Sequence, residues 1–192
     1  MGNTKEMKRL GDTRTENYIK DNLKVYKDWP KQGINYLNTV DIPKDPDLFW
    51  HTVQWFNQVA DTIDARMLFA ADARGFIWAS PVAFKRQLPM HVVRKKGKMP
   101  GDLISREYQL EYGTDILEVA KIQKPIGTVM IVDDVLATGG TAEAICKLLH
   151  EGIGIEYKNM VVTTLVNITF LPGEKVLNDL GVNVIHLIDV NE

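Results

Sequence analysis

The apolar positions of this chain follow two patterns, which together predict strands that alternate with helices. Five short and nearly continuous apolar runs are typical of buried strands: Met67–Ala71, Met90–Val93, Val129–Val132, Met160–Val166 and Val182–Ile188. Apolar residues that lie three and four positions apart predict a helix at Asp45–Ile63, and helices are also expected at Phe76–Arg86, Thr141–His150 and Glu174–Leu180. Buried strands that alternate with helices favour an α/β fold, a mostly parallel sheet with helices on both faces.

Two regions depart from this alternation. A weaker helical pattern covers Glu16–Tyr26, and Trp29-Pro30 breaks it because the residue before a proline is pushed out of helical geometry. Further along, the strands predicted at Tyr108–Glu111 and Ile116–Val119 lie close together around the turn Tyr112–Asp115. We expect these two strands to form a β-hairpin that projects from the sheet, which makes it a candidate lid.

Composition and charge exclude several classes of protein. The 192 residues are 45% hydrophobic and 25% charged, the balance of a globular chain and not of a disordered or fibrous one. The formal net charge of −2 gives no bulk attraction to nucleic acid or to an anionic membrane. No apolar run approaches the ~20 residues of a membrane span, and Met1–Leu10 lack the apolar core of a signal peptide. We therefore expect a cytoplasmic protein with one domain over residues 1–192 and no nucleic-acid or membrane partner.

The most informative segment follows the strand at Val129–Val132. Asp133 and Asp134 come directly after it, and the small-residue loop Ala137–Thr141 then opens a helix. Glycines let the backbone approach a ligand closely, and the N–H groups of a helix start bind anions. Two carboxylates suit sugar hydroxyls or a hydrated cation. Because ligands of open α/β sheets bind at the carboxyl ends of strands, the segment indicates a site for a phosphorylated sugar.

Other candidates carry weaker signals. The chain contains neither a P-loop nor the glycine fingerprint of dinucleotide-binding proteins. Arg74, beside Gly75 at a predicted strand end, can point a fork of donors at a pyrophosphate. A basic cluster in a loop with glycine and proline is usually a solvated face, but next to an anion site it can neutralise a polyphosphate; its members are Arg94, Lys95, Lys96 and Lys98. The four histidines share no metal-ligand spacing.

Residues 129–141 match the signature for 5-phosphoribosyl-1-pyrophosphate (PRPP) of the type I phosphoribosyltransferases. Three more segments resemble the adenine-specific branch of that family: Ala71–Phe76 its pyrophosphate loop, Val93–Gly101 its basic loop, and Tyr108–Gly113 its catalytic flap. The segments follow the family's order, and the resemblance covers the chain from about residue 29 to the C-terminus. It implies the type I phosphoribosyltransferase fold, with an N-terminal arm and base-binding hood over about residues 1–40 and a flap over about residues 95–120.

The resemblance also implies a reaction of purine salvage, in which adenine and PRPP give AMP and pyrophosphate. It implies Mg²⁺ as cofactor, held mainly by pyrophosphate and water and not by a protein metal site, and it implies a homodimer. The catalytic residues would be Glu111, Arg74 and Tyr112. The PRPP-binding residues would be Asp133, Asp134, Ala137, Thr138, Gly139, Gly140, Thr141, Arg74, Arg94, Lys95 and Lys98, and the base-binding residues Ile34, Asn35, Tyr36 and Ile168.

Within this assignment each group of residues has a role. The loop Ala137–Thr141 would hold the 5-phosphate, and Asp133 with Asp134 would hold the ribose hydroxyls. Arg74 and the basic loop would bind pyrophosphate. Glu111 would manage the proton on the imidazole ring of the purine, and the flap would close over the site to exclude water.

The base-binding half departs from the family's pattern. Where the family has Phe-Arg-Asp, this chain has Tyr36-Leu37-Asn38. The family's Val-Glu-Leu becomes Val166-Asn167-Ile168, and its Gly-Arg becomes Gly173-Glu174. The choice of base is therefore less strongly determined than the use of PRPP.

Two alternatives stay open. The first is a transferase for hypoxanthine, guanine or xanthine; enzymes of this fold that use 6-oxopurines present a lysine to the exocyclic oxygen, and Thr164–Thr169 contains none. The second is a PRPP-sensing regulator on a catalytically dead fold. The presence of Arg74, Glu111 and Lys98 favours an enzyme over such a sensor.

Overall fold

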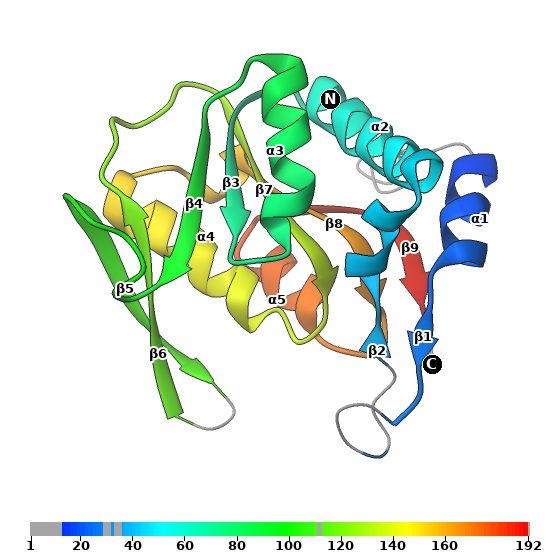
Figure 1. The fold of residues 1–192 in the computed structure, drawn as a ribbon. Helices are drawn as coiled ribbons and strands as arrows, with labels where there is room; N and C mark the ends of the chain where they lie inside the picture. The colour runs from blue at the N-terminus through cyan, green and yellow to red at the C-terminus, as the bar shows by residue number, and fades with distance from the viewer. Residues whose placement is uncertain (1–12, 29–31, 33–35, 111–112, 192) are drawn as a thin grey trace.

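A seven-stranded sheet forms the centre of the computed structural model, which describes residues 13–28, 32, 36–110 and 113–191 (Figure 1). Its strand order is β5-β6-β4-β3-β7-β8-β9. Five of these strands run parallel to one another: β3 (Ala65–Ala71), β4 (Met90–Lys95), β7 (Thr128–Leu136), β8 (Met160–Ile168) and β9 (Asn183–Val190). The predicted α/β class with a mostly parallel sheet is therefore confirmed.

Helices cover both faces of the sheet, and each face has its own apolar core. One core combines α1 (Thr13–Asn22), α2 (Pro46–Thr62) and α3 (Gly75–Arg86) with strand residues such as Leu68 and Ala70. The other combines α4 (Gly140–Ile153) and α5 (Gly173–Asp179) with Phe69 and Ala71. Neighbouring residues of β3 thus enter opposite cores, because side chains alternate between the faces of a sheet.

The start of α2 shows how local sequence sets an element boundary. The Asp45 side chain accepts hydrogen bonds from the N–H groups of Asp47 (3.0 Å) and Leu48 (3.1 Å), and Pro46 occupies the first turn. An aspartate cap satisfies N–H groups that have no partner within the helix, and proline has no N–H to leave unsatisfied. The helix predicted from Asp45 therefore begins as expected.

The predicted hairpin consists of β5 (Leu103–Leu110) and β6 (Gly113–Ala120), which pair antiparallel along their whole length. The first strand starts five residues before the predicted Tyr108, because its early part packs on α4, where Ile104 lies against Gly152. The hairpin joins β4 through two residue pairs, Arg94 with Glu118 and Lys95 with Leu117. Beyond them it extends past the edge of the sheet, as Figure 1 shows.

The N-terminal segment differs from the prediction. The helix expected over Glu16–Tyr26 ends at Asn22, and Val25–Tyr26 forms a short strand, β1. This strand pairs antiparallel with β2 (Tyr36–Leu37), so backbone pairing to a distant segment replaces the last helical turn. Two 3-10 helices, η1 (Thr39–Lys44) and η2 (Tyr157–Asn159), complete the described elements. Among the residues that the structure describes, no helix is both long and apolar enough to cross a membrane.

Candidate active site

The candidate site starts at β7, which carries the acidic pair. The strand ends at Leu136, four residues beyond the prediction that ended it at Val132. It is longer because its backbone continues to pair with β8, where Asp133 lies opposite Thr164 and Leu136 opposite Asn167. The acidic pair therefore lies inside the strand, and the loop that follows it is only three residues long before α4 begins.

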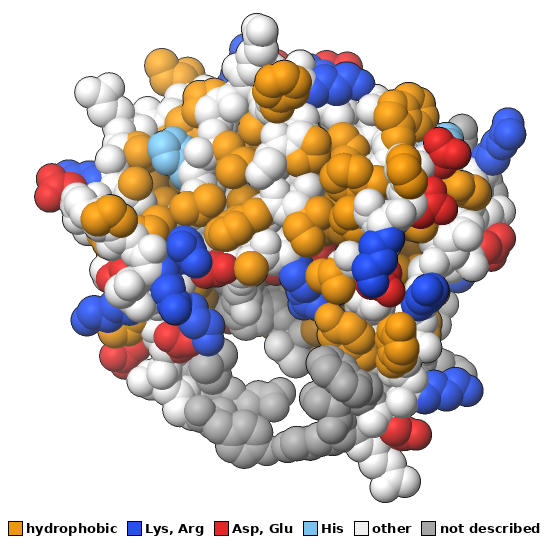
Figure 2. All heavy atoms as spheres, viewed as in Figure 1, with side chains coloured by type: hydrophobic (Ala, Val, Ile, Leu, Met, Phe, Trp, Pro, Cys, Tyr) orange, Lys and Arg blue, Asp and Glu red, His pale blue; other side chains and the backbone are white. Residues whose placement is uncertain are grey.

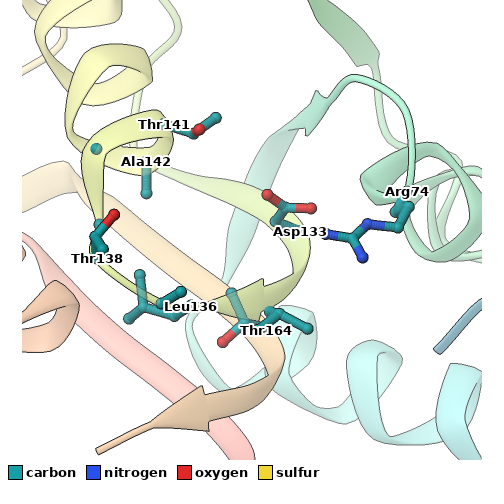
Figure 3. Close-up of a pocket in the computed structure, with 11 residues that line it drawn as sticks. Arg74, Asp133, Leu136, Thr138, Thr141, Ala142 and Thr164 are labelled. Carbon is teal, nitrogen blue, oxygen red and sulfur yellow. The ribbon is translucent and has the colours of Figure 1, made fainter. Parts of the chain in front are cut away.

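A pocket of about 210 Å³ opens where β7 ends and α4 begins. In Figure 3, Arg74 extends from the start of α3 toward Asp133, while Thr138 and Thr141 lie on the side of α4. Most of the predicted phosphate-binding residues line this pocket, together with Thr164 of the neighbouring strand. The complete lining is Arg74, Asp133, Val135, Leu136, Ala137, Thr138, Gly139, Gly140, Thr141, Ala142 and Thr164.

The loop has the backbone geometry of an anion site. Gly139 has φ +87°, a conformation that residues with a side chain rarely adopt, and it precedes the first turn of α4. A Cβ at Gly139 would lie 2.8 Å from the Cα of Gly173, while the N–H of Gly173 donates to the carbonyl of Ala137 at 3.1 Å. The loop is therefore held in close backbone contact with the start of α5. The first N–H groups of α4, which have no partner within the helix, are available to an anion.

The structure separates the two acidic side chains that the sequence placed together. Asp133 faces the pocket, whereas Asp134 is completely buried and does not line it. The Thr39 hydroxyl donates a hydrogen bond to Oδ2 of Asp134, and Nε of Arg74 lies 3.2 Å from the same oxygen. Asp134 thus connects the N-terminal segment to Arg74.

Sequence reasoning did not identify Thr39 or Thr164 as site residues. The burial of Thr39 against Asp134 follows from a contact between residues 95 positions apart, for which the local sequence contains no signal. Thr164 could have been found, because it lies on the strand after the loop helix and pairs with Asp133. An expected order of parallel strands would place it beside the acidic pair.

Asp133 has an unusual acidity. Burial and the negative charge of Asp134 together raise the pKa of its carboxyl from 3.8 to about 8. The backbone N–H of Asp134, which donates to Oδ1 of Asp133 at 2.9 Å, opposes this shift only in part. A carboxyl with such a pKa can exist in either protonation state near neutral pH, and positive charge or hydroxyl donors brought by a ligand would favour the ionised state.

Arg74 lines the pocket and also contacts the buried carboxylate of Asp134. It follows β3 and immediately precedes α3, and 40% of its side chain is exposed. Gly75 comes next, and a Cβ there would collide with the backbone carbonyl of Val132 in β7. The glycine therefore lets α3 pack close to β7, and this close packing brings Arg74 to the edge of the pocket.

The basic loop is held by carboxylates and does not line the pocket. Nε of Arg94 lies 2.9 Å from Oδ2 of Asp72, and Nζ of Lys95 lies 2.6 Å from Oδ2 of Asp115. The buried Glu118 accepts a hydrogen bond from the N–H of Gly97 at 3.0 Å. Figure 2 shows Lys and Arg side chains gathered on this face, near the end of β4.

Several other predicted residues lie away from the pocket. Lys98 is exposed on the basic loop. Tyr36 is half-buried in β2, and Ile168, at the end of β8, packs against the core beneath α1–α3. Glu111, Tyr112, Ile34 and Asn35 lie outside the described residues. Among the described residues, no three His, Cys, Asp or Glu side chains are grouped so that they could hold a metal ion.

Comparison with known proteins connects this geometry to a family. The phosphoribosyl transferase domain model matches residues 50–162. Adenine phosphoribosyltransferase of Mycoplasmopsis agalactiae is 40% identical over 171 residues, which are 88% of this chain and 98% of that protein. Adenine phosphoribosyltransferase of Yersinia enterocolitica is 36% identical over 173 residues, which are 90% of this chain and 91% of that protein.

Solved structures of adenine phosphoribosyltransferases are also similar to this chain. The adenine phosphoribosyltransferase of Thermoanaerobacter pseudethanolicus superimposes with a TM-score of 0.81 at 34% identity, over 91% of this chain and 99% of its own. The Giardia lamblia enzyme complexed with 9-deazaadenine gives a TM-score of 0.83 at 26% identity, over 92% and 98% of the two chains.

Proposed function

The chain belongs to the phosphoribosyltransferase family, and from this we propose that it transfers the phosphoribosyl group of PRPP to adenine, which gives AMP and pyrophosphate for purine salvage. The observation that carries the proposal is the pocket where the loop Ala137–Thr141 and the start of α4 face Asp133. A phosphate and a sugar in one ligand match this pairing of an anion cradle with a carboxylate. The relatives named as adenine phosphoribosyltransferases support adenine as the acceptor.

In this proposal the loop binds the 5-phosphate through its backbone N–H groups and the Thr138 and Thr141 hydroxyls. Asp133 accepts hydrogen bonds from the ribose hydroxyls in its ionised state. As pyrophosphate leaves, positive charge develops on the ribose ring, and fixed charges stabilise that charge without a covalent intermediate. Asp134 already binds Thr39 and Arg74, so its contact with the ribose stays a prediction.

The leaving pyrophosphate would bind Arg74, Lys95 and Lys98, and Arg94 is proposed to take part in PRPP binding beside them. Lys95 pairs with Asp115 in this structure, so pyrophosphate would compete with this carboxylate for the Lys95 ammonium group. Glu111 and Tyr112, which follow β5 in the sequence, are proposed to handle the purine proton and to close the flap.

Mg²⁺ fits this site as an ion carried by the substrate. Asp133 and the Thr138 hydroxyl offer oxygen atoms, which a hard cation prefers, but the described residues contain no complete set of protein ligands. When bound to pyrophosphate, the ion would neutralise charge on the leaving group. The residues of the chain would position the ion mainly through the substrate and through water.

Adenine is proposed to bind beside Ile168, with the backbone at Ile34–Tyr36 accepting a hydrogen bond from the 6-amino group. A backbone acceptor does not depend on the side chain at Asn35. The described end of β8 also agrees with adenine, because Thr164–Thr169 contains no lysine that could donate to a 6-oxo group. A site built to pair with a polar group can reject an analogue by ~10⁴–10⁵.

We also propose that the enzyme acts as a homodimer. The face of α2 and α3 exposes two large apolar side chains, Trp50 (58% exposed) and Phe84 (87% exposed), and Figure 2 shows apolar side chains across this face. A second copy of the chain would remove them from water. Sedimentation equilibrium at micromolar concentration measures this directly, and a monomer mass would contradict it.

A base panel tests the proposed reaction. The purified protein is mixed with PRPP, Mg²⁺ and one of adenine, hypoxanthine, guanine or xanthine, and nucleotide formation is followed by chromatography. We expect adenine to exceed the others by at least about 10²-fold in kcat/KM. Preference for a 6-oxopurine would refute the choice of base, and PRPP binding without turnover of any base would favour the sensor alternative.

A further inference from the structure

The phosphate loop is supported by a hydrogen bond between two residues that do not line the pocket. Asn167, the second-last residue of β8, is 1% exposed, and its Nδ2 donates a hydrogen bond to Oε2 of Glu174 at 3.1 Å. Glu174 lies in the first turn of α5 and is half-buried. Their bond spans the four-residue connection between β8 and α5 and so ties the first turn of α5 to the end of β8.

The start of α5 in turn contacts the phosphate loop, residues 137–141, through a backbone hydrogen bond and a close approach of two glycines. The N–H of Gly173 donates to the carbonyl of Ala137 at 3.1 Å, and a Cβ at Gly139 would lie 2.8 Å from the Cα of Gly173. The Leu136 side chain also lies against Gly173, but at Gly139 backbone meets backbone, where no rotamer change can absorb a shift of α5. A displacement of α5 would therefore pass directly into the loop.

The hydrogen bond between Asn167 and Glu174 determines how the Asn167 side-chain amide is oriented. Oδ1 of Asn167 is buried without a hydrogen-bond partner in the described part of the chain, so the amide is oriented by the bond from Nδ2 to the Glu174 carboxylate. Hydrogen bonds with one charged partner are shorter and stronger than neutral ones. Asn167 also lies opposite Leu136, the residue before the loop, which brings the same amide beside the loop from the strand side.

We propose that Asn167 and Glu174 are positioning residues, which set the affinity of the phosphate loop for PRPP without touching it. This inference rests on the proposed function of that loop. The pair should act on KM for PRPP and leave kcat and KM for adenine nearly unchanged. We expect an increase in KM for PRPP of about tenfold, below the ~10² that a misplacement of 1 Å can cost.

A donor–acceptor exchange tests the pair. Asn167→Asp keeps the shape but sets a second carboxylate against Glu174, and we expect KM for PRPP to rise. The double variant Asn167→Asp with Glu174→Gln reverses donor and acceptor, and should bring KM for PRPP back to within about threefold of the wild type. Lys175→Ala is the matched control, because Lys175 lies on the same helix and pairs outward with Asp179.

The outcomes separate the two proposals. Glu174→Ala, at a half-buried position, provides a second variant if Asn167→Asp does not fold, and circular dichroism reports folding in each case. An unchanged KM for PRPP in folded Glu174→Ala, or no recovery in the double variant, overturns the positioning role. A wild-type protein that fails to use PRPP with any base refutes the proposed function instead, whatever the variants do.

Discussion

Thr39→Val removes one hydroxyl from the most deeply buried polar contact of the site. Thr39 and Asp134 are both completely buried, and the hydroxyl donates directly to Oδ2 of the carboxylate. Among the described residues, Oδ1 of Asp134 has no hydrogen-bond partner, so Nε of Arg74, at 3.2 Å from Oδ2, and the neighbouring Asp133 side chain would remain near this carboxylate. Valine has almost the same shape as threonine, so no cavity is created. The loss is therefore mainly electrostatic and not a packing defect.

The magnitude follows from the charge of the acceptor. A hydrogen bond to a charged group contributes about 1.5–3 kcal/mol, and a buried acceptor that loses its donor keeps its desolvation cost. With a loss of about 2 kcal/mol, the melting temperature of a domain of this size should fall by about 4–8 °C. Thermal and urea unfolding at pH 7 and fixed protein concentration measure both quantities.

Thr39→Ser serves as the control for this prediction. It keeps the hydroxyl and loses only a methyl group, whose burial contributes about 0.8 kcal/mol. We expect the order of stability to be wild type, then Thr39→Ser, then Thr39→Val. If Thr39→Val is as stable as the wild type, or more stable than Thr39→Ser, the hydroxyl does not stabilise Asp134 and the reasoning is wrong.

Two further predictions concern the pocket. Asp133 binds its proton more tightly in the folded chain than in the unfolded chain, because its pKa is raised from 3.8 to about 8. The free energy of unfolding should therefore fall as pH rises between these two values. Asp133→Asn should remove this part of the pH dependence, which urea titrations from pH 5 to 8 measure. An equal slope in the variant would contradict the shift. Gly139→Ala forces a side chain onto φ +87° and toward Gly173, so PRPP affinity measured by calorimetry should fall at least about tenfold, whereas an unchanged affinity would show that the loop adapts.

The sequence pattern alone was sufficient for the architecture and for the location of the loop Ala137–Thr141 that lines the pocket. Strands with continuous apolar runs and helices with apolar stripes depend on local periodicity, and β3, α2 and β8 lie close to where this periodicity predicts them. The loop Ala137–Thr141 could be found because glycines and hydroxyl residues after a strand are themselves a local signal. Its place in the pocket then follows from the rule that ligands bind at the carboxyl ends of parallel strands.

Local sequence failed where pairing with a distant segment decided the conformation. Val25–Tyr26 continues a helical pattern, yet it forms a strand because β2 offers it backbone partners. The strand β7 runs on to Leu136 for the same reason, because β8 continues beside it. Propensity is a weak preference, which such tertiary hydrogen bonds override.

By itself, then, the sequence determined the order of the elements, the α/β class and the residue types of the phosphate loop, because each depends on neighbours within a few positions. Only the tertiary structure decided which acid faces the pocket. Asp133 and Asp134 are indistinguishable as a local pattern, but one lies on the open side of β7 and the other is buried against Thr39 and Arg74. Likewise, Asn167 and Glu174 meet only because β8 and α5 fold back on each other, and no local signal encodes that contact.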